Sequence, residues 1–298
     1  MGDGERLSVR VHNWSVSLAM LAAFTFMGCG VSNIKKVPVA QIRPAKEATK
    51  ADLITAYNQA AARVTSINAA VTLTPTAGSA YSGVIEEYHE VNAFILAQKP
   101  AMIRVIGQAP VLAKNVFDMT SDGQTFHIYI PSKNKFIVGP ASLERSAEKP
   151  IENLRPQHLL DAFFWPQIPD GAPVLFEENQ DATDRYYVIT LTQNDAPSDI
   201  ERKLWFNRAD LNLSRVEIYG NGGRLLSDIH FADWQPAGGA NPFPWHITVN
   251  RPHDDYQLDI HVTKLALNES ITEDRFRLEQ PPGTELVQLG ESGHGSQK

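Results

Sequence analysis

The stretch LWFNRADLNLSRVEIYGNGGRLLSDIHFADW, residues 204–234, alternates apolar and polar residues in three runs separated by two turn sequences. The turns are NRADLN and NGGR, which are rich in the residues that reverse a chain. Alternation with a period of two places successive side chains on opposite faces of a strand. Strands joined by turns this short are antiparallel, because parallel strands need a long crossover. The stretch therefore predicts an antiparallel meander.

The same alternation recurs on both sides of this stretch. The predicted strands are residues 68–74, 81–89, 93–98, 101–108, 115–120, 124–130, 135–138, 174–177, 185–193, 200–207, 213–219, 224–233, 243–250 and 256–265. This order excludes a doubly wound α/β fold, which requires helices between parallel strands. We predict a mainly β (α+β) chain with one long antiparallel sheet, curved into an open half-barrel with an apolar interior.

Some strand positions must share one face of this sheet. They are Phe126, Ile128, Ile130, Leu204, Phe206, Val216 and Ile218. These side chains line either a packed core or a lipid cavity, and an acyl cavity carries no motif because it binds without directional chemistry.

Two segments have helical spacing of apolar residues. KADLITAYNQAAARVTSI starts at Lys50, with Asp52 near its positive end, and RPQHLLDAFFWPQIP covers residues 155–169. The apolar residues are Leu53, Ile54 and Tyr57 on the first segment, and Leu159, Leu160, Phe163, Phe164 and Trp165 on the second. We predict that both helices cover the concave side of the sheet, where these residues act as a lid that lines a cavity or as ordinary core.

Composition and charge exclude some partners. Of 298 residues, 43% are hydrophobic and 20% charged, which is typical of a globular chain. Lys and Arg total 27 against 34 Asp and Glu, giving a net charge of -7 with no densely basic stretch. Nucleic acid is therefore not expected as a partner, and neither is electrostatic attraction to anionic lipid.

Cys29 is the only cysteine, so an internal disulfide is impossible. It follows the apolar segment SVSLAMLAAFTFMG, residues 15–28, which as a helix would be about 21 Å long against ~30 Å of hydrocarbon. That length fits a signal peptide. The residues Phe26, Met27, Gly28 and Cys29 resemble a bacterial lipoprotein signal, which implies a diacylglyceryl group and an N-acyl chain on Cys29. The alternative is a signal anchor with an incidental cysteine.

These features divide the chain into four parts. We expect a lipoprotein signal peptide at 1–28, the lipidated Cys29 and a flexible tether at 29–49, the sheet domain at 50–288 and a disordered tail at 289–298. Gly30 stands where an Asp would signal inner-membrane retention, so the resemblance implies an outer-membrane anchor facing the periplasm of a bacterial cell envelope.

Residues 51–286 resemble the bacterial lipoprotein carrier and receptor family LolA/LolB and related lipoproteins. The likeness rests on element order and on four phrases: PAMIRVIGQAPVLAKNVFDMTSDGQTFHIYIPSKNKFIVG, LLDAFF, the 204–234 stretch and DRFRLEQPPGTEL. The resemblance implies about eleven antiparallel strands, a helical lid, and a cavity for lipoprotein acyl chains. It also implies a membrane or cargo contact at the loop GQAPVLAKN, with Val111 and Leu112 at its tip. The alternative is that these two residues plug the end of the barrel.

Enzymatic and metal motifs are weak. Two polar runs contain ligand-type residues: Glu86, Glu87, His89 and Glu90 in EEYHE, and His253, Asp255, Asp259 and His261 in RPHDDYQLDIH. In EEYHE, alternation along a strand places Glu87 and His89 on one face and Glu86 and Glu90 on the other. In RPHDDYQLDIH, the same alternation favours a charged outer face over a metal site. We expect no catalytic residues, no metal and no cofactor other than the covalent lipid.

Together these observations predict a non-enzymatic lipoprotein that binds the acyl chains of lipoproteins or other lipids and aids their transfer to the outer membrane. The further expected partners are the membrane, which the chain contacts through its lipid anchor, and a periplasmic carrier protein. The alternative is an envelope-assembly lipoprotein on the same scaffold, with its cavity filled by its own side chains and protein partners at its rim.

Overall fold

The computed structural model describes residues 44–79, 84–111, 114–143, 153–193, 199–238 and 242–290. The chain divides into the units Met1–Gln41 and Ile42–Lys298, and every described residue lies in the second. The predicted signal peptide, the lipidation site Cys29 and the loop residue Leu112 lie outside the described residues.

Alternating sequences form strands through almost the whole second unit. The strands are β1 Ser66–Ser79, β2 Val84–Glu87, β3 Val91–Gln98, β4 Met102–Gln108, β5 Asn115–Ser121, β6 Thr125–Ile130, β7 Lys135–Pro140, β8 Val174–Gln180, β9 Arg185–Thr192, β10 Ile200–Asn207, β11 Leu213–Gly220, β12 Arg224–Pro236, β13 Pro242–Arg251, β14 Tyr256–Leu267 and β15 Glu285–Gln288. Every strand except β15 overlaps a predicted one. The chain is therefore mainly β, as predicted.

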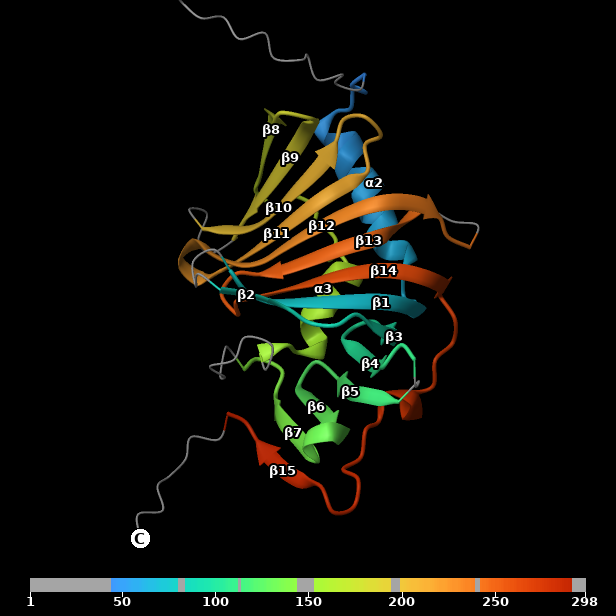
Figure 1. The fold of residues 1–298 in the computed structure, drawn as a ribbon. Coiled ribbons are helices and arrows are strands. Elements are labelled where there is room, and N and C mark those ends of the chain that lie inside the picture. Colours follow the sequence, from blue (N-terminus) through green and yellow to red (C-terminus); the bar gives the residue numbers. More distant parts are fainter. Residues whose placement is uncertain are drawn as a thin grey trace, which may run out of the picture. The chain divides into compact units, whose positions relative to one another are not determined.

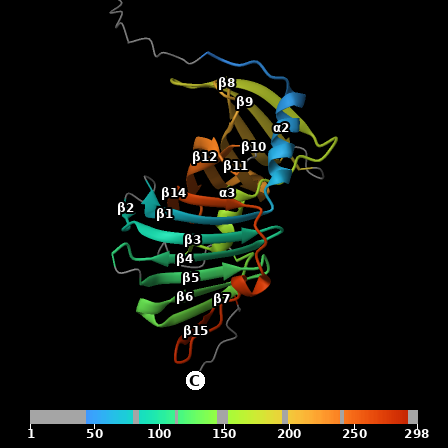
Figure 2. The same ribbon diagram turned by 90° about the vertical axis from the view of Figure 1, so that its right-hand side faces the viewer.

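All of these strands belong to one 15-stranded sheet (Figure 1). Its order is β15-β7-β6-β5-β4-β3-β1-β14-β13-β12-β11-β10-β9-β8, with β2 paired to the end of β1. Two meanders thus meet at β1, which is hydrogen-bonded to β3 on one side and to β14 on the other. The sheet bends strongly between them (Figures 1 and 2), and several strands carry register shifts that permit this curvature, including one at Ala70/Val71 in β1.

The expected strand number and the purely antiparallel pairing were wrong. Within the described residues the sheet has 15 strands instead of about eleven, and β15 pairs with β7 in parallel. A parallel pair requires a long connection, and here most of the domain lies between β7 and β15 in sequence. The short run ELVQ shows no alternation by itself, because its pairing depends on a strand that is far away in the chain.

The first predicted helix is present as α2, Lys50–Arg63. Thr49 and Asp52 form a capping box: the Thr49 hydroxyl accepts from the Asp52 amide at 3.2 Å, and the Asp52 carboxylate accepts from the Thr49 amide at 3.0 Å. Two hydrogen bonds from Thr49 lower the pKa of Asp52: the one from its hydroxyl has the larger effect, and the one from its backbone amide the smaller. None of the helices in the described part of the chain combines the length and the apolar character that a bilayer crossing requires.

The second predicted helix is shorter than residues 155–169. It consists of the 3-10 turn η4, Pro156–Leu159, followed by the helix α3, Leu160–Phe163. Phe164 leaves the helix with an extended backbone two residues before Pro166, as expected ahead of a proline. Further 3-10 turns are η2 Pro131–Lys133, η5 Asn221–Gly223 and η6 Glu273–Phe276.

The concave side next to α2 is filled by aromatic rings. Trp165 stacks on Tyr57 of α2 at a centroid distance of 6.3 Å, and meets the rings of Phe231 at 5.5 Å and Trp234 at 5.9 Å on β12. The Tyr57 hydroxyl donates to the Pro166 carbonyl at 3.0 Å, and burial raises its pKa to about 12, so it stays protonated as a donor. This half of the concave side is therefore a solid core.

A segment near the C-terminus covers part of the convex side. Residues 271–279, which we call the strap, cross β3, β4 and β5 on their outer face. Arg104 holds Asp118 with two hydrogen bonds of 3.0 and 2.8 Å and donates to the carbonyls of Arg275 and Arg277. Phe276 of the strap is buried against Leu96. The strap leads the chain to β15.

Candidate functional site

An apolar cavity of about 790 Å³ opens on the inner face of the other half of the sheet. Its lining residues are Pro75, Tyr88, His89, Glu90, Val91, Ala109, Pro110, Val116, Phe117, Met119, Ile128, Ile130, Ser132, Lys133, Lys135, Ile137, Leu154, Val287 and Leu289. They come mainly from β5, β6, β7 and β15 and from the turns at one end of these strands. Ligand cavities in proteins commonly measure about 300–1,000 Å³, so this one can hold a small molecule or a lipid tail.

The wall of the cavity is built from alternate residues of adjacent strands. Ile128 on β6 is paired with Ile137 on β7, and Val287 on β15 is paired with Ile137 from the other side. Met119 and Ile128 are buried, whereas Ile130 is only partly buried, nearer the end of β6. These side chains offer no hydrogen-bonding groups, so the interior of the cavity is suited to a hydrocarbon.

Gly107 shapes one wall. A Cβ atom at this position would lie 2.4 Å from the ring of Phe117, so the absence of a side chain leaves the space that this ring occupies. Phe117 is paired with Gly107 across β4 and β5 and lines the cavity. A glycine is therefore required here for close approach and not for an unusual backbone conformation.

The charged residues that line the cavity lie at the ends of strands or in the connections between strands. Glu90 lies in the β2–β3 connection, Lys133 ends η2, and Lys135 is the first residue of β7. The Lys135 Nζ atom lies 3.8 Å from a carboxylate oxygen of Glu285 on β15, and both side chains are exposed. The mouth therefore carries both signs of charge around an apolar opening.

Val111 stands beside this mouth. It follows Pro110, which lines the cavity, and it is 92% exposed. The turn is closed at its base by the Ala109 amide, which donates to the Lys114 carbonyl at 2.9 Å. Because Val111 is so exposed, it does not plug the end of the barrel. Its predicted partner Leu112 lies outside the described residues.

The predicted lid residues belong to the packed core and do not line the cavity, although η4, which contains Leu159, packs against β4 and β5 of the cavity half. Leu53, Tyr57, Leu159, Phe163 and Phe164 are buried, while Ile54 and Leu160 are partly buried against the same core. Neither these seven residues nor Trp165, the other predicted lid residue, is among the residues that line the cavity. The side chains that do line it include Ile128 and Ile130, whose alternation on β6 was the sequence signal for either a core or a lipid cavity.

Solved structures with low sequence identity are similar to this chain. One is a LolA superfamily protein from Nitrosomonas europaea, 14% identical, with a TM-score of 0.47, covering 78% of this chain and 99% of that chain. Another is a DUF1329 family protein from Desulfovibrio piger, 13% identical, with a TM-score of 0.47 and coverages of 76% and 95%. A third is an outer membrane lipoprotein-sorting protein domain from Vibrio parahaemolyticus, 11% identical, with a TM-score of 0.44 and coverages of 75% and 94%.

The structural neighbours of the chain thus include a LolA superfamily protein and a lipoprotein-sorting domain, in agreement with the resemblance noted in the sequence. No protein-family model matches the sequence, and no curated protein does. At these identities and TM-scores the likenesses do not bear on what this chain binds, so its function has to be argued from its own cavity.

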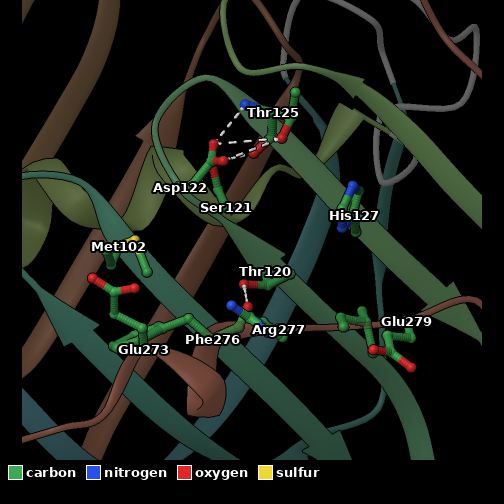
Figure 3. A pocket seen from close by; sticks show the side chains of 11 residues that line it. Met102, Thr120, Ser121, Asp122, Thr125, His127, Glu273, Phe276, Arg277 and Glu279 are labelled. Atoms are coloured by element: carbon green, nitrogen blue, oxygen red, sulfur yellow. Dashed lines mark hydrogen bonds between the residues drawn. The ribbon is translucent and has the colours of Figure 1, made fainter.

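A second, more polar pocket of about 370 Å³ lies under the strap on the convex side (Figure 3). Asp122 accepts from the amides of Gln124 and Thr125, both at 2.8 Å. Burial acts to raise the pKa of Asp122, but these amides hold it below its usual value. Ser121 Oγ donates to the Thr125 carbonyl at 2.9 Å. The polar groups of this pocket therefore stabilise the β5–β6 turn, and Ser121 is not paired with a histidine.

Proposed function

We propose that this chain binds an acyl chain of a lipoprotein or another lipid in its apolar cavity and passes it to a membrane at the cavity mouth. The observation that carries the proposal is the cavity of about 790 Å³, lined mostly by apolar residues, with its charged lining residues at strand ends and in connections. Each methylene group removed from water contributes about 0.8 kcal/mol, so a long tail binds without any directional contact. The proposal describes a binding protein and not an enzyme.

The position of the mouth decides how a tail would leave. The rim is formed by turns such as the one between β4 and β5, and it includes no residue of α2 or α3. Release therefore proceeds past Val111 without displacing the aromatic core. In this proposal Cys29 carries the lipid anchor predicted from the sequence and holds the chain on the periplasmic side of the outer membrane.

A fluorescent fatty acid tests the proposal. The unit Ile42–Lys298 contains every described helix and strand, and it lacks the segment expected to carry the anchor. We expect saturable binding of dansylundecanoic acid to this unit, with one molecule per chain, and displacement by palmitate. Binding that does not saturate, or that palmitate leaves unchanged, would rule out the cavity as an acyl site.

Val111→Asp is expected to slow transfer of a bound fluorescent fatty acid to phosphatidylcholine vesicles about tenfold. A carboxylate at the loop tip cannot enter the apolar part of the bilayer, whereas valine can. The thermal midpoint should stay unchanged, because the side chain is 92% exposed. Stopped-flow fluorescence measures the transfer rate.

Leu175→Asp is the matched control for this variant. Leu175 is another exposed aliphatic residue, 65% exposed, and it lies on β8 at the opposite end of the sheet. Its replacement should leave transfer unchanged. Equal slowing by both substitutions would mean that general surface charge, and not the loop at the mouth, governs transfer.

A second candidate function is supported by the packed half of the concave side. The rings around Trp165 fill that half. A concave side filled by side chains is expected of an envelope-assembly lipoprotein that binds protein partners at its rim. This candidate predicts that the fatty acid does not bind, so the titration above separates the two.

A further inference from the structure

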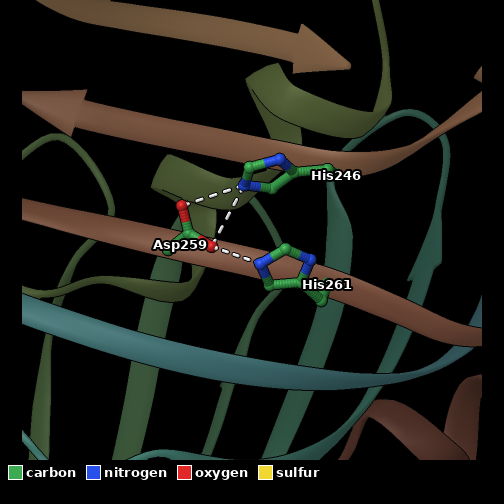
Figure 4. Close-up of side chains that lie close together, drawn as sticks. All are labelled: His246, Asp259 and His261. Atoms are coloured by element: carbon green, nitrogen blue, oxygen red, sulfur yellow. Dashed lines mark hydrogen bonds and ion pairs between the residues drawn. The ribbon is translucent and has the colours of Figure 1, made fainter. Parts of the chain in front are cut away.

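Two histidines from neighbouring strands lie against one carboxylate on the convex face of the sheet (Figure 4). His246 on β13 is directly opposite His261 on β14. Asp259 precedes His261 by two residues and therefore points to the same side of β14. The intervening Ile260 and the neighbouring Ile247 are fully buried on the inner side, which places the three polar residues on the outer side.

The three side chains converge through specific atoms. His246 Nε2 lies 3.1 and 3.0 Å from the two carboxylate oxygens of Asp259, and His261 Nε2 lies 2.9 Å from Oδ1. The two imidazole rings are stacked, with centroids 4.1 Å apart and planes 14° apart. Both Nε2 atoms thus point toward the same carboxylate instead of toward separate partners.

This arrangement has the donor set and spacing of a transition-metal site. One ligand atom from each residue lies within 4.8 Å of the other two, and in the described part of the chain this is the one group of three that meets that condition. A zinc ion bound at about 2.1 Å to each atom requires separations of at most about 4.2 Å, which small side-chain rotations achieve. The exposed fractions of 34%, 28% and 55% leave room for such rotations.

A fourth residue orients the carboxylate. Thr248, the residue paired with Asp259 across the two strands, donates its hydroxyl to Asp259 Oδ2 at 3.1 Å. Such outer contacts orient the ligands of metal sites. On the next strand, His230 lies 3.2 Å from Asp228 instead, so this nearby histidine belongs to a different contact.

We propose that His246, Asp259 and His261 bind a divalent transition-metal ion, with zinc as the representative, across β13 and β14. Two neutral imidazoles and a carboxylate suit zinc, copper or nickel, whereas magnesium and calcium prefer all-oxygen ligands. Three protein ligands leave a further coordination position open toward solvent, for water or for a group of another molecule. The site lies outside the apolar cavity and does not depend on acyl binding.

Zinc titration of the full chain, without an affinity tag, tests this proposal. We expect a high-affinity zinc ion that is absent from the His246→Ala/His261→Ala double variant, measured by equilibrium dialysis. The single variant His261→Ala should weaken zinc binding by about tenfold or more. Magnesium should not compete. Subtracting the double variant removes any zinc held by Cys29 or by histidines elsewhere.

His230→Ala is the matched control, because His230 lies on the adjacent strand β12 and contacts a carboxylate in a similar way. It should leave zinc affinity unchanged. The X-ray absorption spectrum of the zinc-loaded chain should show two imidazole ligands that the double variant lacks. Equal binding by wild type and double variant, or equal weakening by His230→Ala and His261→Ala, would overturn the proposal.

Discussion

Ile130→Glu is expected to weaken fatty-acid binding about 100-fold at pH 8, which corresponds to about 2.8 kcal/mol. Ile130 is partly buried on the cavity wall near the end of β6, where water can reach a glutamate while the cavity is free of ligand. A bound acyl chain removes that water, and an uncompensated carboxylate then lies against hydrocarbon. The dissociation constant for dansylundecanoic acid measures the effect.

The same variant should recover affinity as the pH falls. Contact with an acyl chain disfavours the charged form of the introduced glutamate, so its pKa is higher in the complex than in the free protein. Protonation therefore accompanies binding, and the affinity of the variant rises toward that of the wild type at lower pH. A pH-independent defect would indicate distortion of the wall instead of a charge penalty.

Two controls accompany Ile130→Glu. Ile130→Met keeps an apolar side chain of similar size and should bind the fatty acid within a factor of about ten of wild type. Leu175→Glu adds the same charge to an exposed position on β8, far along the sheet from the cavity, and should have no effect. Wild-type affinity in Ile130→Glu would show that the tail binds elsewhere.

Trp165→Ala is expected to lower the free energy of unfolding by about 3–5 kcal/mol, which urea denaturation measures. Trp165 is 8% exposed and its ring contacts Tyr57, Phe231 and Trp234, so truncation leaves a void that these neighbours cannot close. Acyl affinity should change little, because Trp165 does not line the cavity. The variant thus distinguishes a core from a lid.

Trp205→Ala provides the comparison. Trp205 lies on the outer face of β10, where its indole nitrogen donates to Glu217 at 3.2 Å and Arg215 lies over its ring at 5.3 Å. Loss of these partly exposed contacts should cost about 1–2 kcal/mol. If Trp165→Ala costs no more than Trp205→Ala and also changes acyl affinity, the segment around Trp165 is a movable lid after all.

The elements of the sheet could be predicted because their signals are local. Alternation and turn residues located the 204–234 meander, and Thr49 with Asp52 marks the start of α2 within four residues of sequence. β15 carried no such signal, since its four residues form a strand only by pairing with β7. Its parallel direction follows from the path of the strap and not from its own composition.

The position of the cavity could not be predicted for a related reason. Ile130 on β6 and Phe206 on β10 have the same alternating pattern, yet Ile130 lines the cavity and Phe206 meets the ring of Tyr57. The difference depends on which half of the sheet α2 and the rings beside it cover. Helical spacing indicates that a segment has an apolar face, but it does not specify the strands against which that face packs.

The histidine cluster shows most clearly which features the sequence determines and which depend on the tertiary structure. The period of two in β14 by itself places Asp259 and His261 on one face, and the apolar residues that alternate with them, such as Ile260, make that face the outer one. Only the tertiary structure brings His246 opposite His261, because the register of β13 against β14 is set by many backbone hydrogen bonds and buried pairs at once. Local pattern thus determined the strands and their faces, whereas register and packing, which sum contacts between distant residues, decided where the cavity and the cluster form.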